Sequence, residues 1–188
     1  MKKALILGIS GQDGSYLSEY LLGLGYEVHG VVRSISLEDP IHRLWRLHHI
    51  MSKITLHPAN IESYPSLLKV FQLVKPDECY HLGSESFVSY SFEDEYSTMN
   101  TNINGTHHVL ASLNDACPEC KLYFAGSSEM FGNCVDDDGY QRETTPMRPV
   151  SPYGCAKVYS FHLARNYRNS YGMFISNGIL FNQESPRR

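Results

Sequence analysis

The sequence predicts a doubly wound α/β fold, in which one parallel sheet carries helices on both faces. Two observations favour this fold. Apolar runs of strand length alternate along the chain with segments whose apolar residues recur at helical spacing. A turn with three spaced glycines, residues 8–14, directly follows the first of these runs. The chain has 188 residues, of which 42% are hydrophobic, so it is long enough to enclose one core. We therefore expect a single domain over residues 1–188.

The first strand and helix are the most clearly marked. Residues 4–9 form a continuous apolar run (ALILGI), as expected of a strand buried on both faces of a parallel sheet. Apolar side chains at Leu17, Tyr20, Leu21 and Leu24 then recur at helical spacing. Gly25 is suited to end this helix in a left-handed conformation.

Five further strands and three helices follow in alternation. The expected strands are Glu27–Arg33, Ile54–Pro58, Glu78–Leu82, Lys121–Ala125 and Met173–Leu180. The expected helices are Tyr64–Val74, Ser97–Ala116 and Pro152–Tyr171, which are long enough to cross between parallel strands. The composition of Ser34–Ser52 predicts a mobile loop. With right-handed crossovers and the strand order 3-2-1-4-5-6, the carboxyl ends of strands one, four, five and six would surround one cleft.

The charge and hydropathy patterns argue against nucleic acid and membranes as partners. The 16 basic and 20 acidic residues give a formal charge of −4, which provides no positive field for a phosphate backbone. The apolar runs are much shorter than the roughly 20 residues of a membrane span, and the N-terminus shows no signal-peptide pattern. We therefore expect a cytoplasmic protein.

The five cysteines are an odd number without framework spacing, which favours reduced thiols. Cys117 and Cys120 form the only CxxC pair, and no second ligand pair follows at a suitable distance. We therefore expect no metal site. We also interpret three histidines as structural residues: His81, His107 and His108.

The glycine-rich turn predicts a dinucleotide-binding domain of the Rossmann type. Gly8, Gly11 and Gly14 lie between a buried strand and an amphipathic helix, where a pyrophosphate would meet backbone N–H groups and the positive end of the helix. The spacing is GxxGxxG rather than GxGxxG.

The end of the second strand favours NADP over NAD. It carries Arg33 and Ser34 and lacks the carboxylate that would bind the ribose 2′-hydroxyl and repel a 2′-phosphate. Arg33 could instead be a solvated loop charge. Gly83 and Ser84 follow strand four on the adenosine side, and Asn60 and Ile61 follow strand three, near the expected adenine.

Two further motifs predict an acid–base site. Tyr153 and Lys157 are four residues apart on one helix face, where the lysine would stabilise the tyrosinate, lower the pKa of the phenol towards neutrality and hold ribose hydroxyls. Ser127, Ser128 and Glu129 end strand five at the carboxyl edge of the sheet. A hydroxyl there could polarise a carbonyl group.

With these motifs in place, the chain resembles the extended short-chain dehydrogenase/reductase family, and within it the GDP-mannose 4,6-dehydratases. The resemblance spans essentially the whole chain. It is carried by residues 8–16 (GISGQDGSY), 25–33 (GYEVHGVVR), 82–86 (LGSES), 127–132 (SSEMFG), 148–157 (RPVSPYGCAK) and 177–188 (NGILFNQESPRR).

The resemblance implies a mechanism. Tyr153, supported by Lys157, would take the proton of the sugar 4-hydroxyl while hydride passes from C4 to NADP. Glu129 would remove the C5 proton and help expel the 6-hydroxyl as water, after which the hydride returns to C6. Ser127 stands where the family usually has threonine and would polarise O4. The substrate would be GDP-mannose and the product GDP-4-dehydro-6-deoxy-D-mannose.

The resemblance also implies binding residues. The cofactor would be lined by Gly8, Ile9, Ser10, Gly11, Gln12, Asp13, Gly14, Arg33, Ser34, Asn60, Ile61, Leu82, Gly83, Ser84, Glu85, Ser86, Tyr96, Lys157, Gln183 and Arg188. The sugar nucleotide would meet Ser86, Ser128 and Asn177. Asn60 replaces a common aspartate and Gln183 a common histidine, and both can still form hydrogen bonds.

The family also implies features beyond this site. Residues 34–52 would help to build a homo-oligomer, dimer or tetramer, and most of the substrate domain would lie beyond Arg188. Three alternatives remain open at the level of sequence. These are another NAD(P)-dependent sugar-nucleotide epimerase or reductase, a cofactor-sensing protein, and a fragment that binds NADP without turnover.

Overall fold

The computed structural model describes all 188 residues and confirms the predicted fold class. Its single sheet has six strands in the predicted order β3-β2-β1-β4-β5-β6, and every neighbouring pair is parallel. The strands are β1 (Lys3–Leu7), β2 (Glu27–Val32), β3 (Ile54–Pro58), β4 (Glu78–His81), β5 (Lys121–Ser127) and β6 (Ile175–Leu180). Because the order reverses between β1 and β4, the carboxyl ends of these strands flank the switch point of the sheet.

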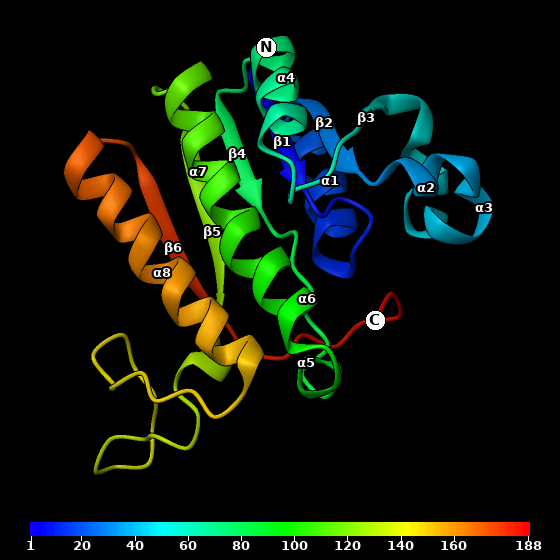
Figure 1. Ribbon diagram of the computed structural model, residues 1–188. Coiled ribbons are helices and arrows are strands. Elements are labelled where there is room, and N and C mark those ends of the chain that lie inside the picture. Colours follow the sequence, from blue (N-terminus) through cyan, green and yellow to red (C-terminus); the bar gives the residue numbers. More distant parts are fainter.

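Helices cover both faces of the sheet (Figure 1). On one face lie α4 (Tyr64–Val74), α7 (Gly105–Ala116) and α8 (Pro152–Tyr171), whose buried side chains form one apolar cluster with Leu5 and Leu7 of β1. On the other face α1 (Gln12–Gly23) and the 3-10 helix η1 (Trp45–Lys53) enclose Ala4 and Ile6. All four of these β1 side chains are fully buried, which explains why the first strand is a continuous apolar run.

Local signals set the ends of two helices as the sequence predicts. Gly25 adopts a φ of +79° after α1, and its N–H donates to the Leu22 carbonyl at 3.0 Å while that of Tyr26 donates to the Leu21 carbonyl at 3.0 Å. Helix α8 has the predicted bounds. It begins where the Ser151 hydroxyl accepts a hydrogen bond from the N–H of Gly154 at 3.0 Å.

The segment after β2 is not the expected mobile loop. It forms α2 (Ser34–Glu38), α3 (Pro40–Arg43) and η1. The expectation was wrong because Leu44, Leu47 and Ile50 recur at near-helical spacing and bury their side chains in the core on the α1 side of the sheet.

Strand β3 and helices α4 and α8 have the predicted bounds, and the other predicted strands differ by one or two residues at one or both ends. Strand β1 ends at Leu7 because Gly8, with a φ of +88°, turns the chain. The predicted helix at 97–116 is part of a longer helical segment made of α6 (Glu95–Met99), a π-helical turn η2 (Asn100–Asn104) and α7, and a short helix α5 (Tyr90–Glu93) precedes it.

The last eight residues, which we call the C-terminal strap (residues 181–188), leave β6 and cross the carboxyl edge of the sheet towards α1 (Figure 1). Two hydrogen bonds fix the strap to the start of α1. Gln12 Nε2 donates to the carbonyl of Gln183 at 2.8 Å, and Ser185 Oγ donates to Gln12 Oε1 at 2.9 Å. None of the helices combines the length and the apolar surface that crossing a membrane requires.

Candidate active site

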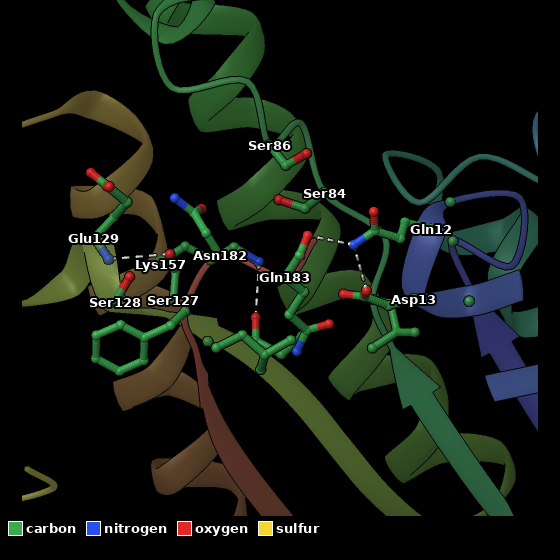
Figure 2. A pocket seen from close by; sticks show the side chains of 18 of the residues that line it. Gln12, Asp13, Ser84, Ser86, Ser127, Ser128, Glu129, Lys157, Asn182 and Gln183 are labelled. Atoms are coloured by element: carbon green, nitrogen blue, oxygen red, sulfur yellow. Dashed lines mark hydrogen bonds between the residues drawn. The ribbon is translucent and has the colours of Figure 1, made fainter. Parts of the chain in front are cut away.

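The carboxyl edge of the sheet holds a cleft of about 350 Å³. Glu129, Ser127 and Lys157 lie on one side of it and Gln12 and Asp13 on the other, with Gln183 between them (Figure 2). The structure thus brings together most of the residues predicted from sequence: Gly8, Gly11, Gln12, Asp13, Gly14, Leu82, Ser84, Ser86, Ser127, Ser128, Glu129, Tyr153, Lys157, Gln183 and Arg188.

The glycine turn forms an open backbone cradle at one end of this cleft. A Cβ atom on Gly14 would lie 2.4 Å from the carbonyl oxygen of Gly8, and one on Gly8 would lie 2.8 Å from the backbone nitrogen of Gly83. Side chains at these positions would therefore collide with backbone. The first N–H groups of any helix have no partner within the helix, and α1 begins beside this turn without a capping side chain to accept them. This arrangement fits the pyrophosphate of a dinucleotide.

Ser127 and Glu129 are fixed by the turn that ends β5. The short 3-10 helix η3 (Ser128–Met130) starts there, and Ser127 Oγ accepts a hydrogen bond from the N–H of Glu129 at 3.2 Å. Because the Ser127 oxygen acts as an acceptor in this contact, its hydroxyl hydrogen stays free to donate to a ligand oxygen in the cleft.

Tyr153 and Lys157 enter the cleft from the first turns of α8, and both are buried. Lys157 Nζ donates to the carbonyl of Ala125 at 2.9 Å and lies 5.7 Å from the centre of the Tyr153 ring. Burial lowers the pKa of Lys157 from 10.5 to about 8. The cleft therefore contains a cation that the protein solvates poorly.

The pKa of Tyr153 is raised, whereas the sequence predicts that Lys157 lowers it. Burial of the phenol is the largest cause; the hydroxyls of Ser127 and Ser84 oppose it, and the Glu129 carboxylate adds to it. The prediction was wrong in direction because Tyr153 and Lys157 are desolvated together. The effect of Glu129 also indicates that its carboxylate is close enough to Tyr153 to influence the phenol electrostatically.

Comparison with known proteins identifies the family. Residues 5–188 match the family described as GDP-mannose 4,6 dehydratase. The chain belongs to this family. It is 43% identical over 192 residues to a GDP-mannose 4,6-dehydratase of Vibrio cholerae, and 43% identical over 195 residues to the human GDP-mannose 4,6 dehydratase. These alignments cover 100% and 98% of this chain but 51% of either relative, so the chain spans about half the length of the curated relatives it matches.

Solved structures with the same fold include other sugar-nucleotide enzymes. A dTDP-glucose 4,6-dehydratase from Streptomyces venezuelae, with NAD and TYD bound, superposes with a TM-score of 0.84 at 24% identity, over 99% of this chain and 57% of that one. A UDP-glucose 4-epimerase from Brucella ovis in complex with NAD gives a TM-score of 0.83 at 20% identity, over 97% of this chain and 52% of that one. These similarities show the fold.

Four residues expected near adenosine do not line the cleft: Arg33, Ser34, Asn60 and Ile61. Arg33 and Ser34 are exposed at the start of α2, after the carboxyl end of β2. Asn60 Oδ1 accepts the N–H of Glu62 at 3.0 Å within its own turn, and Ile61 packs against Gly105. All four nevertheless follow β2 or β3 at the same edge of the sheet as the glycine turn.

Two other predicted residues are placed away from the cleft. Asn177 lies within β6, where its Nδ2 donates to the carbonyl of Phe161 at 3.2 Å, so its side chain faces α8 instead of a ligand. Tyr96 is 84% exposed on α6 and lines a separate groove with Pro149 and Val150. The structure therefore places neither side chain in the cleft. The resemblance assigned both residues from their positions in the sequence, which do not give the direction of a side chain.

The remaining predicted residues support the cleft from behind. Ile9 is fully buried beneath the glycine turn, Ser10 is half-buried in it, and Gly83 packs on Gly8. The backbone of Glu85 is held by Asn102 of η2, which was not predicted from the sequence as a site residue. Asn102 Oδ1 accepts from the N–H of Glu85 and from Ser84 Oγ, both at 2.9 Å, and its Nδ2 donates to the carbonyl of Glu85 at 2.9 Å. The π-helical turn thus holds the Ser84 hydroxyl in the cleft.

Two polar side chains that line the cleft were not predicted from the sequence, those of Asn182 and Arg46. Asn182 lies two residues after the end of β6 and lines the cleft together with Lys157 (Figure 2), so its place after a predicted strand was a usable signal. Arg46 enters from η1, in a segment expected to be a loop, and no sequence signal marked it.

Proposed function

We propose that this chain is the cofactor-binding part of a GDP-mannose 4,6-dehydratase, which converts GDP-α-D-mannose to GDP-4-dehydro-6-deoxy-α-D-mannose and water. One observation carries the proposal. Ser127, Glu129, Tyr153 and Lys157 line a single cleft together with the glycine turn. An epimerase or a 4-reductase needs a tyrosine, a lysine and a hydroxyl, whereas elimination of water also needs a base for C5, and Glu129 supplies a carboxylate beside Tyr153.

The chemistry requires a nicotinamide dinucleotide, and the residues of the cleft fit one. The glycine turn and the start of α1 would hold its pyrophosphate, and Lys157 would hold the nicotinamide ribose. We propose NADP because Arg33 and Ser34, at the end of β2, suit a 2′-phosphate and no carboxylate stands there. A bound nicotinamide would supply the hydride acceptor for C4 of the sugar and the hydride donor for C6.

In this proposal Tyr153 Oη takes the proton of the sugar 4-hydroxyl. Because burial raises the pKa of Tyr153, the tyrosinate needs stabilisation by its surroundings, and the Ser127 and Ser84 hydroxyls both act to lower this pKa. Once Tyr153 has taken the proton, it no longer needs the Ser127 hydrogen. The Ser127 hydroxyl, whose oxygen already accepts the N–H of Glu129, would donate to O4 as the carbonyl develops. The buried Lys157 ammonium, 5.7 Å from the Tyr153 ring, favours the tyrosinate.

Glu129 carries the second half of the reaction. The 4-keto group acidifies the C5 hydrogen, so a carboxylate can remove this proton, and protonated Glu129 can then deliver it to the departing 6-hydroxyl, which leaves as water. When hydride is added at C6, the proton that Tyr153 took from the 4-hydroxyl would pass to C5, which returns both residues to their starting state. Ser86 and Ser128 line the same cleft and would contact the sugar nucleotide. Asn182, which lies just beyond β6 and lines the cleft, is better placed for such a contact than Asn177.

Mass spectrometry of sugar nucleotides tests this function. GDP-mannose incubated with the protein and catalytic NADP should lose one water, whereas UDP-glucose and dTDP-glucose should stay unchanged. Glu129→Gln should abolish the loss of water while NADP binding persists, because the amide cannot take the C5 proton. Normal turnover by this variant would show that Glu129 is not the base. Since the chain spans about half the length of its relatives, the assay is run in parallel on a longer chain.

We further propose that the protein acts in the cytoplasm as a homo-oligomer, dimer or tetramer. All five cysteines are free thiols, which suits a reducing compartment. Large exposed side chains on α5, α6 and α8 support association with a second copy: Phe92, Tyr96 and Tyr159.

A further inference from the structure

Arg46 is an unpaired cation held at the mouth of the cleft. Its Nε donates to the carbonyl of Arg187 at 2.6 Å, and its guanidinium stacks on the Trp45 ring at 4.4 Å from the ring centre. Its two Nη groups have no hydrogen-bond partner and no carboxylate within ion-pair distance. The neighbouring guanidinium groups differ, because Arg187 pairs with Glu19 and Arg188 with Glu184.

The carbonyl that holds Arg46 is itself anchored from several sides. Arg187 Nη2 contacts Glu19 Oε1 at 2.5 Å, Nη1 donates to Ser15 Oγ at 3.2 Å, and the guanidinium lies 4.2 Å from the centre of the Tyr16 ring. Glu19 Oε1 also contacts Nε2 of His49, in η1, at 2.5 Å. One carboxylate of α1 therefore fixes both segments that position Arg46, the C-terminal strap and η1.

This arrangement indicates an anion as the missing partner of Arg46. A guanidinium offers five N–H donors in a planar fork and no acceptor, and here four of those donors, on the Nη groups, have no protein partner. The same cleft is lined by the glycine turn and the uncapped start of α1, which also favour negative charge. Asp13 lines this region as well, but its carboxylate faces the Gln183 amide, whose nitrogen can donate to it at 2.7 Å.

We propose that Arg46 is a phosphate-binding residue for the dinucleotide, in addition to the glycine turn. This inference rests on the proposed function, since it assumes that a dinucleotide occupies the cleft. The ligand chemistry is a phosphate monoester or diester, which could come from the 2′-phosphate of NADP or from the pyrophosphate shared by NADP and NAD. The strap and η1 hold the guanidinium in position before the ligand binds, so little side-chain entropy is lost on binding.

Titration calorimetry with NADP, NAD and GDP tests the inference. Arg46→Gln should weaken NADP binding by roughly 10- to 100-fold, as expected when a charge-assisted hydrogen bond is lost. The matched control is Arg43→Gln, because Arg43 is an exposed arginine of α3 whose side chain has no hydrogen bond or ion pair. This variant should bind NADP with the affinity of the unmodified protein. If Arg46→Gln loses affinity for NADP but not for NAD, Arg46 binds the 2′-phosphate. If it loses affinity equally for both, Arg46 binds the pyrophosphate.

Other outcomes would overturn the inference. If Arg46→Gln binds NADP and NAD like the unmodified protein, Arg46 does not hold a dinucleotide phosphate, and this conclusion stands even if only GDP binding is lost. If the unmodified protein binds neither dinucleotide, the proposed function itself fails, so the two failures are distinguishable.

A second readout separates a phosphate contact from a purely structural effect of the strap. A direct ion pair makes binding weaken as salt is raised, because salt screens exposed charges. The salt dependence of NADP binding should therefore be shallower for Arg46→Gln than for the unmodified protein, and Arg46→Lys should restore part of the slope. An unchanged slope in Arg46→Gln would contradict a direct phosphate contact.

Discussion

Replacing Lys157 with methionine should stabilise the fold while it abolishes function. Burial lowers the pKa of Lys157 from 10.5 to about 8. At about 1.4 kcal/mol per pH unit, the buried ammonium costs the folded state about 3 kcal/mol at pH 7. Methionine has a similar length and no charge. The substitution also removes the donor to the carbonyl of Ala125, which costs about 1 kcal/mol, so the net gain is about 2 kcal/mol.

The pH dependence of this gain follows from the direction of the pKa change. The folded state binds the Lys157 proton less tightly than the unfolded state does, so the cost is complete below pH 8. It shrinks as the pH rises from 8 to 10.5 and then vanishes. The advantage of Lys157→Met should therefore disappear at high pH, where only the lost hydrogen bond remains.

Thermal and urea unfolding at pH 7 and at about pH 10 measure this effect. For a chain of this size, about 2 kcal/mol corresponds to a rise in Tm of roughly 4–8 °C at pH 7. Lys53→Met is the control, because Lys53 is exposed at the end of η1 and its replacement should change the Tm little. A lower Tm for Lys157→Met at pH 7, or the same difference at both pH values, would refute the reasoning.

Two further predictions concern the turn and the core. Gly14→Ala places a Cβ atom 2.4 Å from the carbonyl of Gly8 and should lower stability by more than 1 kcal/mol and abolish NADP binding, as measured by thermal unfolding and calorimetry. Gly23→Ala in the same helix meets nothing within 4 Å and should instead stabilise by about 0.5–1 kcal/mol, so equal effects would contradict a specific role of Gly14. Burial lowers the pKa of His81 from 6.5 to about 3, so the folded state loses stability as the pH falls from 6.5 towards 3. His81→Phe should move the acid-unfolding midpoint, followed by circular dichroism, to lower pH, and an unmoved midpoint would assign the acid sensitivity to other groups.

The core architecture and much of the candidate site were predictable because their signals are local. A buried parallel strand shows as an apolar run, and the end of a helix as a glycine or a serine–proline pair, within a few residues of the feature itself. The alternation of these units indicates a doubly wound parallel sheet, and the strand order expected for a dinucleotide-binding sheet is the one observed. Gly8, Ser127 and Tyr153 could therefore be assigned to one edge of the sheet from their positions along the chain, and all three line the cleft there.

Side-chain direction could not be read in the same way. Asn177 and Asn182 belong to the same motif, yet only Asn182 faces the cleft, because Asn177 lies within β6 and turns towards α8. A motif gives the position of a residue along the chain, while the pleat of the strand and the helix that covers it decide where the side chain points.

By itself, then, the sequence determined the alternation of strands and helices, the glycine turn and the tyrosine–lysine helix, since each depends on residues that are close together in the chain. Only the tertiary structure decided the rest. Arg46 reaches the cleft through a hydrogen bond to Arg187, 141 positions away, and Asn102 shapes the loop after β4 from a helix that follows it. The raised pKa of Tyr153 has the same origin, because burial is a sum over neighbours from many segments, and that sum exists only after the chain has folded.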